Sequence, residues 1–109
     1  MEKSILIVED DLTFGTMLKT WFTKNAWNVT LVSKVEQAKV ELNRVYFDLI
    51  ISDLRLPDGD GIILLTWMRE CKLMSPFIIM TSYSDVQTAV LAMKLGAFDY
   101  LQKPINPTI

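Results

Sequence analysis

The sequence predicts an α/β fold, a doubly wound five-stranded parallel sheet with helices on both faces. Short continuous apolar runs alternate four times with segments of helical periodicity, and a fifth short run follows them. Two of the runs end in carboxylates, at the edge of the sheet where ligands bind in such folds. With 109 residues, half of them hydrophobic, the chain is long enough for one domain with a substantial core.

The first predicted strand is the apolar run at residues 5–8, and Glu9, Asp10 and Asp11 follow it. An aspartate at this point suits both the N-cap of a helix and the helix dipole. The helix itself is indicated by apolar side chains spaced i, i+3, i+4, i+7 and i+8, namely Phe14, Met17, Leu18, Trp21 and Phe22.

Residues 27–32 alternate between apolar and polar side chains, as expected for a half-exposed edge strand. The next segment, Ser33-Lys34-Val35-Glu36, has the form of a capping box, in which Ser33 and Glu36 cap the start of a helix reciprocally. The apolar positions of that helix are expected to be Val35, Ala38, Leu42 and Val45.

The rest of the chain is organised around residues 47–53, a predicted strand that ends in Asp53. The run Leu49-Ile50-Ile51 is typical of a strand buried on both faces of a parallel sheet. A loop rich in proline and glycine follows at residues 56–61, so no helix starts close enough for Asp53 to cap it. The third helix is expected to extend to about Cys71, with apolar positions Ile62, Leu65 and Met68.

The remaining residues supply two more strands and one helix. Residues 77–80 predict a buried strand that ends in Thr81, and residues 98–101 a last strand that closes at Lys103-Pro104. Between them, Ser84-Asp85-Val86-Gln87 reads as a second capping box, for a helix with Val86, Ala89, Val90, Met93 and a terminating Gly96. Two half-exposed edge strands and three buried strands fit the flavodoxin-like order 2-1-3-4-5.

Composition and charge exclude several classes of function. With 11 basic and 13 acidic residues the net charge is −2, which gives no electrostatic footprint for nucleic acid or for an anionic membrane. No apolar run is long enough to span a bilayer. The chain has no histidine, so carboxylates are the available metal ligands and Mg²⁺ (or Mn²⁺) is the favoured ion. The single cysteine, Cys71, permits no internal disulfide and fits a reducing cytoplasm.

Polar residues follow four of the predicted strands: Glu9 and Asp10, then Asp53, Thr81 and Lys103. Asp10, Thr81 and Lys103 each have an ordinary explanation when taken alone, as a helix cap, a turn former and a solvated lysine, but Asp53 has no helix to cap. Together they suit phosphoryl transfer to a carboxylate, with Asp53 as the nucleophile. Mg²⁺ would be held by the three acids, while Lys103 supplies a fixed positive charge and the Thr81 hydroxyl a hydrogen bond. No histidine base is required, because an aspartate is already an anion at neutral pH.

This set of residues resembles the receiver domain of response regulators in bacterial two-component systems, over nearly the whole chain from Ile5 onward. The resemblance implies that Asp53 accepts a phosphoryl group from a phosphohistidine on a sensor histidine kinase, as one step of a phosphorelay. It also implies that the metal ligands are Glu9, Asp10, Asp53 and the backbone carbonyl of Arg55. Thr81 and Lys103 match the residues that contact the phosphoryl group.

The same resemblance implies an aromatic switch role for Tyr100 and a cis peptide before Pro104, and makes Arg55 and Tyr83 positions that tune the phosphoryl lifetime. Residues 96–104 look most like receivers of enhancer-binding transcription activators. In such proteins an output domain, which can bind DNA, follows the receiver. The expected chemistry is self-catalysed phosphoryl transfer and slow autodephosphorylation, not turnover as an enzyme.

Receivers normally continue into a fifth helix, whereas this chain stops at Ile109. We therefore expect residues 1–109 to be a receiver domain truncated before or within the fifth helix. One side of the first helix and part of the sheet would then be uncovered. This predicts either a homodimer formed through that face or lower stability than a chain extended by about four helical turns.

Three alternatives use the same residues differently. An aspartyl-phosphate phosphatase or phosphotransferase of the haloacid-dehalogenase kind needs a second Asp two positions past the nucleophile, where this chain has Arg55. A flavodoxin-like cofactor binder needs a small or hydroxyl-rich phosphate loop, and Glu9-Asp10-Asp11 would instead repel a phosphate. A non-phosphorylated pseudo-receiver, acting only as an interaction domain, has no need of an intact set of acids, threonine and lysine.

Overall fold

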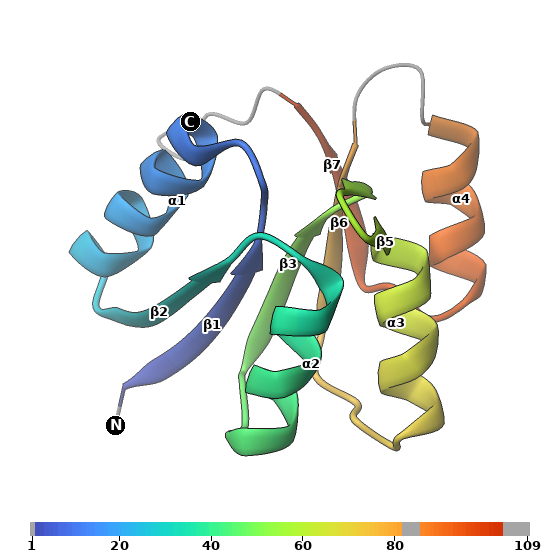
Figure 1. The fold of residues 1–109 in the computed structure, drawn as a ribbon, viewed down its shortest axis with the longest axis horizontal. Helices are drawn as coiled ribbons and strands as arrows, with labels where there is room; N and C mark the ends of the chain where they lie inside the picture. The colour runs from blue at the N-terminus through green and yellow to red at the C-terminus, as the bar shows by residue number, and fades with distance from the viewer. Residues whose placement is uncertain (1, 82–85, 104–109) are drawn as a thin grey trace.

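A computed structural model describes residues 2–81 and 86–103. The predicted fold is confirmed: five strands form one parallel sheet in the order β2-β1-β3-β6-β7, which is 2-1-3-4-5 when these strands are counted along the chain (Figure 1). The elements in chain order are β1 (Lys3–Val8), α1 (Leu12–Lys24), β2 (Trp27–Val32), α2 (Val35–Arg44), β3 (Leu49–Asp53), β4 (Arg55–Leu56), β5 (Gly59–Asp60), α3 (Gly61–Glu70), β6 (Phe77–Thr81), α4 (Val86–Lys94) and β7 (Asp99–Gln102).

The sheet separates two hydrophobic clusters. Among the described residues, α1 is the helix that covers one face of the sheet. Its Leu18 packs in a cluster with Ile5, Ile7, Ile51 and Met80. The helices α2, α3 and α4 cover the other face (Figure 1), over a larger cluster that includes Leu42, Leu64 and Phe77. The run from Ile5 to Val8 is fully buried, because β1 lies inside the sheet with helices on both faces.

The register of the sheet brings the predicted polar residues to one edge. Val8 pairs with Ser52, Asp53 with Met80, and Thr81 with Gln102. Glu9 follows Val8, Asp53 ends its strand, and Lys103 follows Gln102. Because these strands are parallel, all four strand ends lie at the same carboxyl edge.

The loop expected at residues 56–61 contains a short antiparallel ladder. Arg55 pairs with Asp60 and Leu56 with Gly59, so the two-residue strands β4 and β5 form a hairpin directly after Asp53. Leu56 is buried in the larger hydrophobic cluster, which anchors the hairpin to the body of the domain. The segment after Asp53 is therefore more ordered than its proline and glycine content indicates.

Two predicted helix ends are confirmed. The Asp11 side chain accepts a hydrogen bond from the backbone N–H of Phe14 (3.1 Å) and is the N-cap of α1. Gly96 has φ +104°, a left-handed conformation that favours glycine, and it terminates α4. The Ala97 N–H donates to the carbonyl of Ala92 (3.0 Å), as in a glycine-terminated helix of the Schellman type.

The capping box predicted at Ser33 is wrong. The N-cap of α2 is Lys34, whose side chain makes no capping hydrogen bond. The first-turn N–H groups of Val35 and Glu36 donate instead to Asp58, at 2.8 and 3.1 Å, from the turn between β4 and β5. Desolvation raises the pKa of Asp58, but these hydrogen bonds, its own N–H and nearby Lys34 lower the pKa below 3.8. The cap comes from 23 residues away, so local sequence could not reveal it.

Some side chains predicted to lie on buried helix faces are exposed. Val45 follows the last residue of α2 in an extended conformation, which takes its side chain off the helical stripe. Among the α4 side chains that the structure describes, Ala89 and Ala92 are buried, whereas the larger Val90, Leu91 and Met93 are exposed. The exposed side chains among those predicted to be buried are Met17, Val45, Val90 and Met93.

Several expectations fall on residues outside the described ranges. These are the Ser84-Asp85 half of the second capping box, the tuning position Tyr83, the cis peptide before Pro104 and the fifth helix, which would begin within residues 104–109.

Candidate functional site

Asp53 lies at the centre of the carboxyl edge and is 8% exposed. Two hydrogen bonds fix the backbone around it, and Gly61 packs closely against its carbonyl oxygen. The Leu54 N–H donates to the Met80 carbonyl (2.8 Å), and the Ser52 hydroxyl donates to the Asp53 carbonyl (2.9 Å). A Cβ on Gly61 would stand 2.9 Å from that same carbonyl oxygen, so only glycine fits at the start of α3 without a shift. The Asp53 carboxylate therefore projects from a rigid support.

Glu9 and Asp10 reach the same point from the end of β1. Glu9 is buried, and its Oε2 accepts a hydrogen bond from the N–H of Asp11 (3.1 Å). Asp10 is exposed to solvent. One carboxylate oxygen from each of Glu9, Asp10 and Asp53 lies within 4.8 Å of the others. The structure thus brings together the three acids that the sequence predicted to meet.

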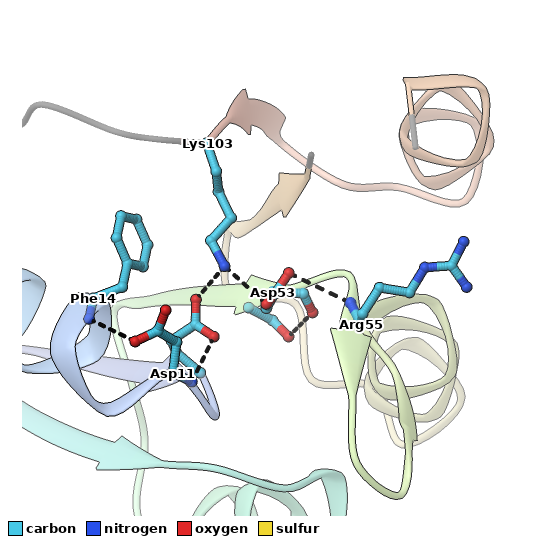
Figure 2. Close-up of polar contacts among 7 residues, drawn as sticks. Asp11, Phe14, Asp53, Arg55 and Lys103 are labelled. Atoms are coloured by element: carbon cyan, nitrogen blue, oxygen red, sulfur yellow. Dashed lines mark hydrogen bonds and ion pairs between the residues drawn. The ribbon is translucent and has the colours of Figure 1, made fainter. Parts of the chain in front are cut away.

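Lys103 closes the site from the end of β7. Its ammonium nitrogen Nζ lies 2.6 Å from Oε1 of Glu9 and 2.9 Å from Oδ2 of Asp53 (Figure 2). The Lys103 backbone is tied to the sheet, since its N–H donates to the carbonyl of Thr81 (2.8 Å). A flexible lysine is thereby held with its charge between two carboxylates.

Burial and neighbouring charges change the pKa values of Glu9 and Lys103. Desolvation raises the pKa of Glu9 from 4.5 to about 7, although the contact with Lys103 and the hydrogen bond from Asp11 act in the opposite direction. The negative charge of Asp53 raises the Glu9 pKa further. For Lys103, desolvation lowers the pKa, but the contacts with Glu9 and Asp53 outweigh it and the pKa is raised. Lys103 is therefore a permanent cation facing acids in excess.

The donor set fits a hard divalent cation. Carboxylate oxygens are the ligands that Mg²⁺ prefers, and three acids converge here. Within residues 2–81 and 86–103, Oε1 of Glu9 is the fully buried side-chain oxygen that accepts no hydrogen bond of good geometry. This oxygen forms an ion pair with the Lys103 ammonium. Desolvation is the main cause of the raised Glu9 pKa, and the negative charge of Asp53 adds to it; a second cation in the crevice would offset that negative charge.

The other predicted residues lie around this centre. Thr81 is fully buried and follows Met80, the residue that pairs with Asp53. The Arg55 N–H makes a long hydrogen bond to Oδ1 of Asp53 (3.4 Å), which places the start of the hairpin beside the carboxylate (Figure 2). Tyr100 is half-buried against the larger hydrophobic cluster. Their predicted functional roles remain predictions.

Sequence reasoning missed three residues that shape the site. The sequence pattern places Gly61 only in a loop and gives no sign that Asp58 caps α2. The helical spacing predicts Phe14 on an apolar face, but its ring centroid also lies 4.8 Å from the Lys103 ammonium nitrogen. No local pattern signals such contacts, because each of them joins residues from different elements of the fold.

Within the described part of the chain, none of the helices is both long enough and apolar enough to cross a bilayer.

Comparison with known proteins assigns the chain to a family. Residues 5–108 match the family described as "Response regulator receiver domain". The transcriptional regulatory protein ZraR of Escherichia coli (strain K12) is 39% identical over 102 residues, which are 94% of this chain and 23% of that protein. The regulatory protein AtoC of the same strain is 36% identical over 102 residues, 94% of this chain and 22% of that protein. The chain thus spans about a quarter of the length of these relatives.

Solved structures agree with this match. The non-phosphorylated HemR receiver domain from Leptospira biflexa superposes with a TM-score of 0.89 at 30% identity, over 98% of this chain and 86% of that chain. A CheY-like response regulator receiver domain protein from Methanospirillum hungatei has a TM-score of 0.92 at 27% identity, over 99% and 86% of the two chains. The predicted resemblance to receivers of transcription regulators is in line with the names of the relatives above.

Proposed function

The chain belongs to the response regulator receiver domain family of two-component systems, and we propose that Asp53 accepts a phosphoryl group from a sensor histidine kinase. The observation that carries this proposal is the convergence of Glu9, Asp10, Asp53 and Lys103 at one sheet edge. Residues 1–109 would act as one receiver domain that controls an output domain such as a transcription regulator. The family is not a class of catalytic enzymes, and its receivers transfer the phosphoryl group onto themselves.

In this reaction an Asp53 carboxylate oxygen attacks phosphorus. The P–N bond to the kinase histidine breaks, its electron pair returns to the imidazole nitrogen, and that nitrogen takes up a proton. Lys103 already lies 2.9 Å from Asp53, so its charge is in place to stabilise the oxygens of the transferred group. The buried Thr81 hydroxyl is the proposed hydrogen-bond donor to that group.

Glu9, Asp10, Asp53 and the carbonyl of Arg55 are the proposed ligands of Mg²⁺. When bound, the ion supplies neutralisation of the charge on the phosphoryl oxygens. The exposed Asp10 and the buried Glu9 would hold it from one strand end, and Asp53 from the next. Six oxygen ligands, some of them water, are expected.

The proposed output is a change in the surface formed by α4 and β7. A dianionic phosphoryl group recruits hydroxyl donors and Lys103, which would draw Thr81 toward Asp53 and free Tyr100 to reorient. Tyr100 is half-buried, so part of its side chain is already in contact with solvent. NMR chemical shifts measured before and after phosphorylation test this proposal. Shifts confined to residues 53–60, with none in α4 or near Tyr100, would count against it.

Phosphorylation of Asp53 can be tested with acetyl phosphate and Mg²⁺, followed by intact mass. The wild-type chain should gain one phosphoryl group, Asp53→Asn none, and the exposed control Asp99→Asn should behave as wild type. A stoichiometric gain by Asp53→Asn would disprove the assignment.

Metal binding can be tested by calorimetry with Mg²⁺. Replacing Glu9 and Asp10 together by Gln and Asn should abolish binding without unfolding the chain, since glutamine keeps the shape of the buried Glu9 side chain and Asp10 is exposed. An unchanged affinity in this double variant would contradict the proposed ligand set.

Partners and location follow the family. A sensor histidine kinase is the proposed phosphoryl donor, and the proposed location is the cytoplasm. The proposed function requires no contact of this domain with a membrane or with nucleic acid. Arg55 argues against the phosphatase alternative, because an enzyme of that kind needs an acid at this position for turnover.

A further inference from the structure

The Lys103 ammonium is one member of a closed ring of four contacts, which also includes Glu9, Asp11 and Phe14. Oε2 of Glu9 accepts from the Asp11 N–H (3.1 Å), and Oδ1 of Asp11 accepts from the Phe14 N–H (3.1 Å). The Phe14 ring centroid lies 4.8 Å from Nζ of Lys103, and that nitrogen lies 2.6 Å from Oε1 of Glu9. Figure 2 shows Phe14 and Asp53 to either side of the Lys103 side chain. The ring joins the start of α1 to the end of β7.

Each link in this ring fixes the next one. The Asp11 cap fixes the backbone of Phe14, and the half-buried ring packs against the hydrophobic cluster beneath α1. An ammonium over an aromatic face is attracted by the negative charge density of that face. The Lys103 side chain is 23% exposed, so part of its surroundings is water, and the Phe14 ring replaces some of that water.

We propose that Phe14 is a positioning residue for Lys103, and that its aromatic face holds the ammonium against Asp53 for phosphoryl transfer. This inference rests on the proposed function, because it assigns Phe14 a part in the phosphorylation of Asp53. Glu9 and Asp53 attract Lys103 from the carboxylate side, and Phe14 limits its movement from the other. An aliphatic side chain of similar bulk at residue 14 would fill the space but would exert no attraction on the charge.

The experiment compares Phe14→Leu and Phe14→Tyr with the wild-type chain in the rate of phosphorylation by acetyl phosphate and Mg²⁺. Phe14→Leu should slow the reaction about 2- to 5-fold, the factor expected for the loss of a partly solvated cation–π contact, and Phe14→Tyr should restore it. The matched control is Phe22→Leu, another half-buried aromatic of α1 in the same cluster, whose rate should equal that of the wild type. A wild-type rate in Phe14→Leu would overturn the proposal.

A double-mutant cycle separates positioning from a general structural role. In a Lys103→Met background, Phe14→Leu should have no further effect on the rate, because the charge that it positions is gone. If Phe14→Leu slows both backgrounds by the same factor, Phe14 acts through the fold and not through Lys103, and the proposal is wrong.

An NMR measurement tests the inference apart from the proposed function. The Lys103 Hε protons should show a ring-current shift that Phe14→Leu abolishes and Phe14→Tyr keeps. Wild-type protein that gains no phosphoryl group would refute the proposed function alone, whereas a Lys103 signal unaffected by Phe14→Leu would refute the positioning role.

Discussion

Replacing Glu9 with glutamine should stabilise the metal-free protein, and the gain should increase with pH. Burial raises the pKa of Glu9 from 4.5 to about 7, and the contacts with Lys103 and Asp11 offset that effect only in part. Between these two pH values the folded protein holds a proton that the unfolded chain has released. The stability contributed by this group is therefore complete below pH 4.5 and is lost as the pH rises to about 7.

The size of this effect follows from the two pKa values. At about 1.36 kcal/mol per pKa unit, the difference between 4.5 and about 7 corresponds to roughly 3 kcal/mol. Roughly 2–3 kcal/mol of it would be lost between about pH 5 and pH 8. Glu9 is 3% exposed, so solvent screens the effect little. For a small domain with a typical stability of about 5–15 kcal/mol, this is a large fraction.

Urea denaturation at pH 5 and pH 8 in the presence of EDTA measures the effect. The free energy of unfolding of Glu9→Gln, relative to the wild type, should rise by roughly 2–3 kcal/mol between the two pH values. Glu36→Gln, on the exposed side of α2, controls for the general loss of a carboxylate. Added Mg²⁺ should stabilise the wild type more than Glu9→Gln, because binding to the folded state favours it. Parallel pH profiles of the two proteins would refute the reasoning.

Three further substitutions test the core, the cap of α2 and the backbone support of Asp53. Leu64→Ala should cost about 2–5 kcal/mol by urea denaturation, because Leu64 is fully buried, whereas Ile63→Ala at a half-exposed position should cost much less. Asp58→Ala should speed hydrogen exchange of the first-turn amides of α2, and equal exchange rates would argue against this cap. The stability that the variant loses relative to wild type should become smaller as the pH falls through the lowered pKa of Asp58. Gly61→Ala should destabilise the fold by about 1–3 kcal/mol and weaken Mg²⁺ affinity by calorimetry, because its Cβ would press on the Asp53 carbonyl; an unchanged affinity would show that the backbone can shift freely.

The sequence by itself determined the order of the sheet and the residues at its carboxyl edge. Continuous apolar runs such as residues 5–8 favour burial on both faces, and their alternation with helical segments predicts a parallel sheet between helices. The strand ends then meet at one edge regardless of the details of the loops. For this reason Glu9, Asp10, Asp53 and Lys103 could be placed together without coordinates.

Only the tertiary structure decided which contacts hold these residues. Asp58 replaces Ser33 as the cap of α2, and Phe14 contacts Lys103, which lies near the other end of the sequence. The choice between Val90 and Ala92 for the buried face of α4 depends on how closely that helix approaches the sheet. These contacts join segments distant in sequence, and their energies depend on distance and burial. Periodicity reports only which side of an element is apolar, so it cannot name the partner that each side chain meets.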